Sequence, residues 1–131
     1  MASPRRPPGE LDRRILALIE REGRPLSGHM LAEMLRAEGR HVAVSLVFRS
    51  LRKLCDQGAL HKLLSARGYV RAPSDHGVYL CCTGCGAVGV VVDERPFGAI
   101  GRGAGEKSFR VRRAFVEVAG LCAPCSRREH R

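Results

Sequence analysis

Apolar residues recur at helical spacing in three segments of the first half of the chain. The first segment predicts a helix over 11–22, which Gly23 and Pro25 end. Ser27 is a good N-cap for a second helix, and Gly39 supplies its C-terminal stop. The apolar stripes consist of Leu11, Ile15, Leu18 and Ile19 in the first helix and of Leu31, Met34 and Leu35 in the second.

A third helix is predicted over about 43–57, where apolar and polar residues fall on opposite sides. Two short strands, over 59–64 and 69–72, follow it around a turn at 65–68. The apolar side consists of Val44, Val47, Leu51, Leu54 and Cys55, and the polar side of Ser45, Arg49, Arg52 and Asp56, with Phe48 and Lys53 at its edge. Three helices before a basic hairpin predict a winged helix-turn-helix domain over 11–72.

The second half of the chain has the pattern of a small mixed domain over 76–131. Its strands are expected over 78–82, 87–92 and 110–119. Residues 73–75, a proline and two small polar residues, predict a hinge before this domain. The stretch 93–108 predicts only a short or broken helix, because it holds four glycines and each costs up to about 1 kcal/mol in a helix interior.

Residues 1–10 predict a disordered basic tail, because they are rich in proline and arginine and poor in apolar side chains. They lack the apolar core of a signal peptide. The sequence also has no run of about 18 apolar residues that would span a membrane. A cytoplasmic protein is therefore expected.

Two Cys-x-x-Cys pairs carry the clearest chemistry: Cys82 with Cys85, and Cys122 with Cys125. Four thiolates at this spacing suit a tetrahedral structural Zn²⁺ site. A disulfide framework and a redox dithiol are the alternatives, and a reducing cytosol favours the metal. A catalytic zinc keeps an open coordination position beside a general base, whereas four thiolates close the shell, so no enzyme is predicted. Cys55 and Cys81 stand outside the pairs.

The formal charge of the chain is +10 and its pI is about 10.2. This excess of positive charge predicts a polyanionic partner, because each neutralised phosphate releases condensed counterions. Two tyrosines and four phenylalanines are too few for a platform on which single-stranded bases stack. A merely soluble basic protein is the alternative, but the winged helix-turn-helix predicted over 11–72 favours double-stranded DNA as the partner.

The order of these parts resembles the ferric uptake regulator family over about 11–125, and most of all its zinc uptake regulator branch. The resemblance rests on the helix motif at 46–51, the hairpin motif at 57–62, His76 and the two cysteine pairs. It implies an α+β fold in which an N-terminal winged helix precedes a small C-terminal α/β dimerisation domain with a four-cysteine zinc site. It also implies a metal-responsive transcriptional repressor that binds an AT-rich palindrome as a homodimer.

The resemblance places Arg49 in the major groove as a base contact. Phe48 stands where the branch has a tyrosine, and it keeps an apolar face for thymine methyl groups. The other expected DNA contacts are Ser45, Arg52 and Lys53 on the third helix and Lys62 and Arg67 in the wing.

The alternative function is a zinc-ribbon nucleic-acid-binding or interaction module without metal sensing. The family's helix ahead of Leu11 is missing or reduced to the tail.

The zinc branch senses metal at a hinge site made of two histidines, a cysteine and a glutamate. His61 and His76 match the two histidines, but the other two positions fall on Ala72 and Val90. The further ligands at hand are Cys81, Asp75, Asp93 and Glu94, of which the thiol of Cys81 is the most zinc-like. We therefore expect a second metal site at His61, His76 and Cys81, or else a protein that binds DNA constitutively.

Overall fold

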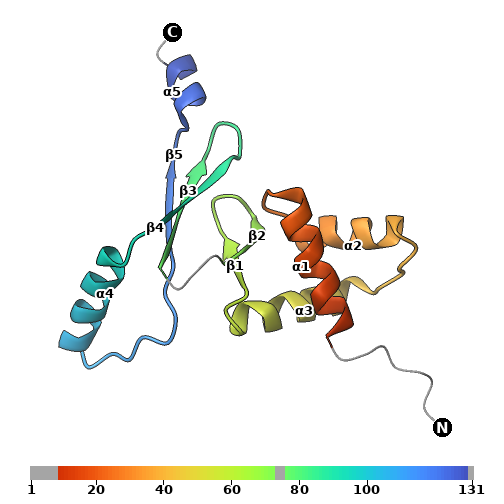
Figure 1. The fold of residues 1–131 in the computed structure, drawn as a ribbon, viewed down its shortest axis with the longest axis horizontal. Helices are drawn as coiled ribbons and strands as arrows, with labels where there is room; N and C mark the ends of the chain where they lie inside the picture. Colours follow the sequence, from red (N-terminus) through yellow and green to blue (C-terminus); the bar gives the residue numbers. More distant parts are fainter. Residues whose placement is uncertain (1–8, 73–75, 130–131) are drawn as a thin grey trace. The chain divides into compact units, whose positions relative to one another are not determined.

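The computed structural model describes residues 9–72 and 76–129, and the chain within these ranges forms two compact units (Figure 1). The described part of the first unit is 9–62 and 67–71, and that of the second is 63–66, 72 and 76–129. Apart from Gly9 and Glu10, the predicted tail and hinge lie outside the described residues.

The first unit contains three helices and, except for Leu63, the strands of a two-stranded hairpin. These are α1 (Glu10–Glu22), α2 (Gly28–Ala37), α3 (Val44–Asp56), β1 (Leu60–Leu63) and β2 (Gly68–Arg71). The predicted apolar stripes meet in one core, whose buried residues are Ile15, Leu18, Ile19, Leu26, Leu31, Ala32, Leu35, Val47, Leu51, Leu54, Leu60 and Tyr69. Helix α2 begins as predicted, because the Ser27 hydroxyl accepts the backbone N–H of Met30 at 3.1 Å.

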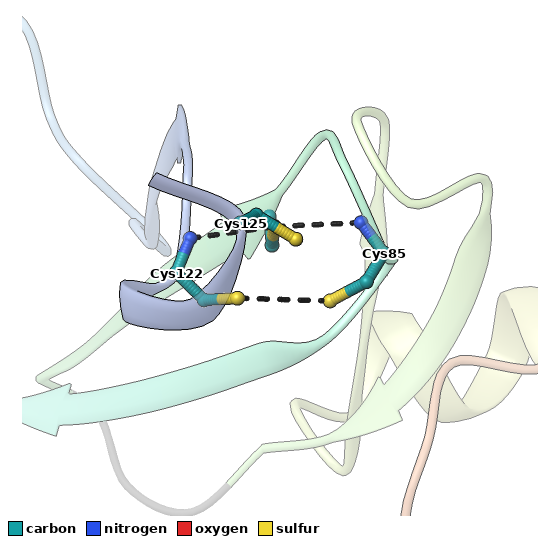
Figure 2. Close-up of side chains that lie close together, drawn as sticks. Cys85, Cys122 and Cys125 are labelled. Carbon is teal, nitrogen blue, oxygen red and sulfur yellow. Dashed lines mark hydrogen bonds between the residues drawn. The ribbon is translucent and has the colours of Figure 1, made fainter. Parts of the chain in front are cut away.

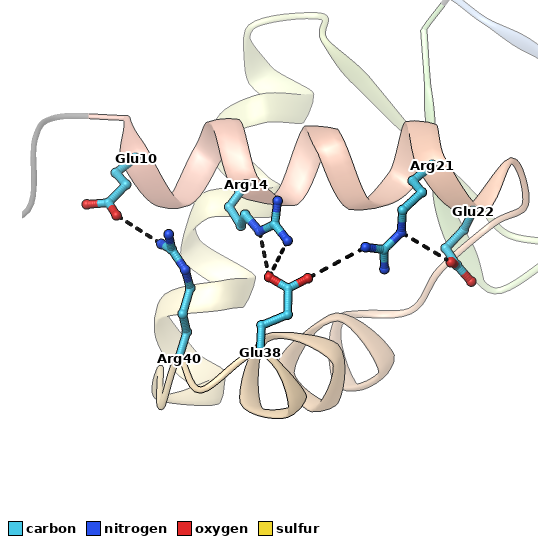
Figure 3. Close-up of polar contacts among 6 residues, drawn as sticks. All are labelled: Glu10, Arg14, Arg21, Glu22, Glu38 and Arg40. Atoms are coloured by element: carbon cyan, nitrogen blue, oxygen red, sulfur yellow. Dashed lines mark hydrogen bonds and ion pairs between the residues drawn. The ribbon is translucent and has the colours of Figure 1, made fainter.

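Charged side chains tie α1 to the end of α2 (Figure 3). Glu38, the C-cap of α2, accepts hydrogen bonds from Arg14 and forms an ion pair with Arg21. The hydrogen bond from Arg14 lowers the pKa of the Glu38 carboxyl. Arg40 donates to Glu10 at 2.9 Å. These pairs are at least partly open to solvent, so they contribute to the orientation of the helices more than to stability.

The second unit is built on a three-stranded sheet with the order β4-β3-β5. Its elements are β3 (Gly77–Cys82), β4 (Val88–Val92), α4 (Arg95–Glu106), β5 (Val116–Gly120) and α5 (Ala123–Glu129). Strands β3 and β4 form an antiparallel hairpin, while β3 and β5 are parallel, with Tyr79 opposite Glu117. Because parallel neighbours end at the same edge of a sheet, the residues that follow β3 and β5 come together.

Two expectations for the second unit are wrong. Helix α4 runs without a break from Arg95 to Glu106, although it contains four glycines. Its start is fixed by a proline in the first turn and by Asp93, which accepts the backbone N–H of Arg95 at 2.9 Å. The strand predicted over 110–119 begins only at Val116, because Val116 pairs with Val78 and β3 offers almost no residues before it. None of the helices in the described ranges is long and apolar enough to cross a membrane.

Candidate metal centre and nucleic-acid interface

The two cysteine pairs meet at one edge of the sheet in the second unit. Cys82 is the last residue of β3 and is paired with Gly120, the last residue of β5. Cys122 comes two residues after Gly120, so it lies near Cys82, and Cys125 follows in the first turn of α5. The backbone N–H of Thr83 donates to the Gly120 carbonyl at 2.8 Å, which holds the two chain segments together beyond the strands.

The sulfur positions fit a tetrahedral zinc site. All four Sγ atoms lie within 4.8 Å of one another, and those of Cys85 and Cys122 are 3.8 Å apart. A tetrahedron with Zn–S bonds of about 2.3 Å has sulfur atoms about 3.8 Å apart. Figure 2 shows the side chains of Cys85, Cys122 and Cys125 directed toward one another. All six cysteines are free thiols, so the disulfide alternative has no pair in this structure.

Two glycines shape the turn that carries the first cysteine pair. Gly86 has φ +80°, a left-handed conformation that L side chains rarely adopt, and its N–H donates to the Cys82 carbonyl at 3.0 Å. A Cβ at Gly84 would lie 3.0 Å from the sulfur of Cys125. The turn therefore needs glycine at 86 for its backbone and at 84 for space around the fourth sulfur.

The four thiols have different surroundings. The Cys82 sulfur accepts the backbone N–H groups of Cys122 at 3.3 Å and Cys85 at 3.5 Å, which lower the pKa of its thiol to about 6. Burial raises the pKa of the Cys125 thiol to about 12. Zinc would hold all four as thiolates, because a coordinated thiol loses its proton to the metal's charge. Cys82 is thus prepared for binding, whereas Cys125 would need the charge of the metal to lose its proton.

The members of the predicted second site lie in different surroundings. His61 belongs to the first unit, whereas His76 and Cys81 belong to the second. The His76 ring is 5.3 Å from the Phe97 ring, edge to face. Among the described residues, the four cysteines are the one group of three or more potential metal ligands that lie close together. The second site at His61, His76 and Cys81 therefore stays a prediction.

Cys81 is buried beside Glu117, a residue that the sequence analysis did not single out. Their Sγ and Oε1 atoms are 3.9 Å apart. The Glu117 carboxylate also accepts the backbone N–H of Leu64 at 3.1 Å and of Ser65 at 2.6 Å. Burial opposes the charged form of Glu117, but these two N–H groups, together with the side chains of Ser65 and Cys81, outweigh it and lower the carboxyl pKa. Glu117 therefore holds the turn between β1 and β2, which belongs to the second unit.

The polar side of α3 is open to solvent. Ser45, Arg49 and Arg52 are exposed, while Val47, Leu51 and Leu54 on the other side are buried. Lys53 forms an ion pair with another residue of the first unit, because its ammonium group lies 2.6 Å from the Asp12 carboxylate. Of the predicted wing contacts, the exposed Lys62 places Nζ 5.9 Å from the centre of the Tyr69 ring, and the exposed Arg67 has φ 50° in the turn.

Phe48 has a packing role that the sequence did not reveal. Its ring lies on Gly28, where a Cβ would come within 2.5 Å of the ring carbon Cζ. The ring of His29 meets it edge to face at 5.3 Å. Phe48 remains 37% exposed, so one part of the ring packs on the start of α2 and the rest lies open on the surface of α3.

Comparison with known proteins agrees with the predicted family. No family model matches the chain. The zinc uptake regulation protein of Escherichia coli K12 is 28% identical over 116 residues, which are 85% of this chain and 68% of that protein, and the Shigella flexneri protein matches equally.

Solved structures of similar proteins share the fold. A zinc uptake regulator in complex with zinc and DNA superimposes with a TM-score of 0.80 and 27% identity, over 93% of this chain and 85% of that one. Holo XcZur superimposes with a TM-score of 0.76 and 25% identity, over 90% and 85% of the two chains. The Francisella tularensis ferric uptake regulator with iron, at 15% identity and a TM-score of 0.64, shares the fold over 96% of this chain and 98% of its own.

These likenesses and the cysteine cluster confirm the predicted α+β fold with a four-cysteine site at its C-terminal end. They also extend over both units, in the order that the helix, hairpin and cysteine motifs follow in the sequence. Over both units the chain is therefore similar to members of the ferric uptake regulator family, and in particular to zinc uptake regulators.

Proposed function

We propose that this protein is a zinc-containing, metal-responsive transcriptional repressor that binds an AT-rich palindromic operator as a homodimer. The observation that carries the proposal is the exposed polar face of α3, the third helix before the hairpin. A recognition helix needs such a face, because base edges are read by side chains that reach into the major groove. As a DNA-binding protein with thiolate metal ligands, it would act in the cytoplasm.

Arg49 is the proposed base contact, because it lies exposed near the middle of the polar face of α3. A guanidinium group can donate two parallel hydrogen bonds to guanine, and a bidentate contact discriminates between bases. Ser45 and Arg52 lie exposed on the same helix and would contact phosphates or neighbouring base edges. Lys53 would contribute less, because its ion pair with Asp12 must weaken before it can reach a phosphate.

The apolar surface of the second unit supports the homodimer. Its described residues bury few large side chains and expose many: Leu64, Leu80, Val90, Val91, Val92, Ile100, Phe109, Val111, Phe115, Val118 and Leu121. Leu80 and Val118 are paired in the sheet and line an apolar groove of about 500 Å³. Exposed apolar surface of this kind indicates an interface, and a palindromic operator calls for a two-fold symmetric protein. A second copy is therefore the proposed occupant.

The alternative from the sequence, a zinc-ribbon module, would not need the first unit for its function. That unit has its own core and accounts for residues 9–62 and 67–71. A metal response would use a second site, separate from the four-cysteine site, with His61, His76 and Cys81 as its proposed ligands. DNA affinity should then rise with zinc beyond one equivalent per chain, and replacing both histidines by alanine should abolish the rise.

The direct test is a DNA-binding titration of the zinc-loaded protein against AT-rich palindromes. Arg49→Ala should lose about 1–3 kcal/mol of binding free energy, or roughly 5- to 150-fold in affinity. Arg36→Ala removes the same charge from an exposed position on α2 and serves as the control. Equal losses in both variants would contradict the recognition-helix assignment, because only the net charge would then matter.

The dimer has its own test in sedimentation of the zinc-loaded protein. Val118→Asp places a charge within the apolar groove and should shift the protein to monomers, since an unpaired charge is costly to bury. Ala99→Asp, at an exposed position of α4 outside this groove, is the matched control. A Val118→Asp variant that stays dimeric would show that this face of the sheet is not the interface.

A further inference from the structure

We propose that Arg128 is a positioning residue of the zinc site, which holds the Cys125 thiolate in place and protects it from attack. The proposal rests on the four-cysteine site holding zinc. Arg128 and Cys125 are three residues apart on α5, a spacing that brings side chains together on one side of a helix. The Arg128 guanidinium donates from Nη2 to the Cys125 sulfur at 2.8 Å.

The charge of the site explains why a cation is useful at this sulfur. Four thiolates around one Zn²⁺ leave a net charge of about −2, which has to be compensated by nearby donors. Cys82 receives backbone N–H groups from Cys85 and Cys122. Cys125 is only 6% exposed, so water gives it little compensation, and Arg128 brings a fixed positive charge to it.

The same hydrogen bond fixes the geometry of the fourth ligand. On another side the Cys125 sulfur is close to Gly84, where a Cβ would come within 3.0 Å of it. A donor that orients a ligand from outside the coordination shell typically changes metal affinity 10- to 100-fold. It also draws electron density from the sulfur, and a thiolate that is already held by the metal then becomes a poorer nucleophile toward alkylating agents.

The four sulfurs should therefore react in a definite order. Cys85 is exposed and is the natural point of attack. Cys125 combines burial with the contact to Arg128 and should react last. Loss of the Arg128 side chain should raise the reactivity of Cys125 without changing the exposure of Cys85.

The chain offers a matched control in Arg127, the preceding residue on α5. It has the same charge and is exposed on the same helix, but the hydrogen bond to the Cys125 sulfur comes from its neighbour Arg128. Arg127→Ala and Arg128→Ala thus remove equal charge and equal side-chain volume. A difference between them measures the contact itself, and not the general electrostatic effect of α5.

The experiment starts from the full-length zinc-loaded protein and measures zinc transfer to EDTA, together with mass-spectrometric mapping of cysteines labelled by N-ethylmaleimide. Arg128→Ala should release zinc 10- to 100-fold faster than the parent and should gain labelling at Cys125, while Arg127→Ala should stay within about twofold of the parent. Arg128→Lys keeps the charge and should recover part of the retention.

Equal release from the two alanine variants, or unchanged labelling of Cys125, would overturn the proposal and leave the zinc site standing. If Arg128→Ala cannot be loaded, Arg128→Lys decides: release equal to that of Arg127→Ala overturns the proposal, and faster release supports it. A parent protein that binds no zinc would instead overturn the proposed function, so the two failures are distinguishable.

Discussion

The contact between Gly28 and Phe48 gives a sharp prediction about the coupling of α2 and α3. A methyl group at position 28 would lie 2.5 Å from Cζ and 2.6 Å from Cε1 of the Phe48 ring, closer than such atoms approach. The ring must therefore move outward when Gly28 is replaced by alanine. Because Phe48 is already 37% exposed, it can move without disturbing the buried core.

Two opposing effects set the size of the change. Alanine gains up to about 1 kcal/mol over glycine in a helix. The displaced ring costs about 0.5–1.5 kcal/mol for an unfavourable rotamer, and overpacking adds about 1–3 kcal/mol where the neighbour cannot yield fully. Gly28→Ala should therefore destabilise the first unit by about 1 kcal/mol in the parent, yet stabilise it by up to about 1 kcal/mol in a Phe48→Ala background.

A double-mutant cycle measures this coupling of about 2 kcal/mol. The free energy of opening α2 and α3 can be followed by amide hydrogen exchange in the zinc-loaded protein, which reports on the first unit alone. Gly101→Ala in α4 is the control, because a Cβ there has no neighbour within 4 Å. The reasoning is refuted if Gly28→Ala changes stability equally with and without the Phe48 ring.

Two further predictions concern the second unit. Glu117→Ala should abolish exchange protection of the Leu64 and Ser65 amides, which now donate to the two oxygens of its carboxylate, while leaving β4 protected. In the parent, the NMR shifts of these two amides should change only as the pH falls below the usual range of a glutamate, since the carboxyl pKa is lowered. Gly84→Ala should speed zinc release to a chelator, because the added methyl group would crowd the Cys125 sulfur at 3.0 Å, and Gly89→Ala, with its nearest neighbour at 4.0 Å, should not.

The helices of the first unit were predictable because one physical rule determines them. Each of the stripes in α1, α2 and α3 combines an apolar face with a recognisable end, and all three faces fill one core. The four cysteines were predictable for a similar reason, since a tetrahedral metal restricts both the ligand type and the spacing. Local patterns suffice when a single local requirement sets the structure.

Features that depend on partners distant in the sequence were not predictable. The pairing of Lys53 with Asp12 joins α3 to α1, and the acceptor role of Glu117 depends on a turn more than fifty residues earlier. The start of β5 depends on where its neighbour β3 begins. Helix propensity also misjudged α4, because it adds the costs of single glycines and omits the capping contact from Asp93.

The two metal-related parts of this chain differ in how complete they are. The four-cysteine cluster has all its ligands in place, whereas the sensing positions of the zinc branch fall on Ala72 and Val90, neither of which can donate to a metal. Val90 is 46% exposed on the edge strand β4, beside Val91 and Val92. An exposed apolar row on an edge strand favours association, so position 90 would suit contact with a second copy in the proposed homodimer better than metal binding. A metal response in this protein would therefore depend on His61, His76 and Cys81, and with fewer ligands it would require more zinc than the closed cysteine site.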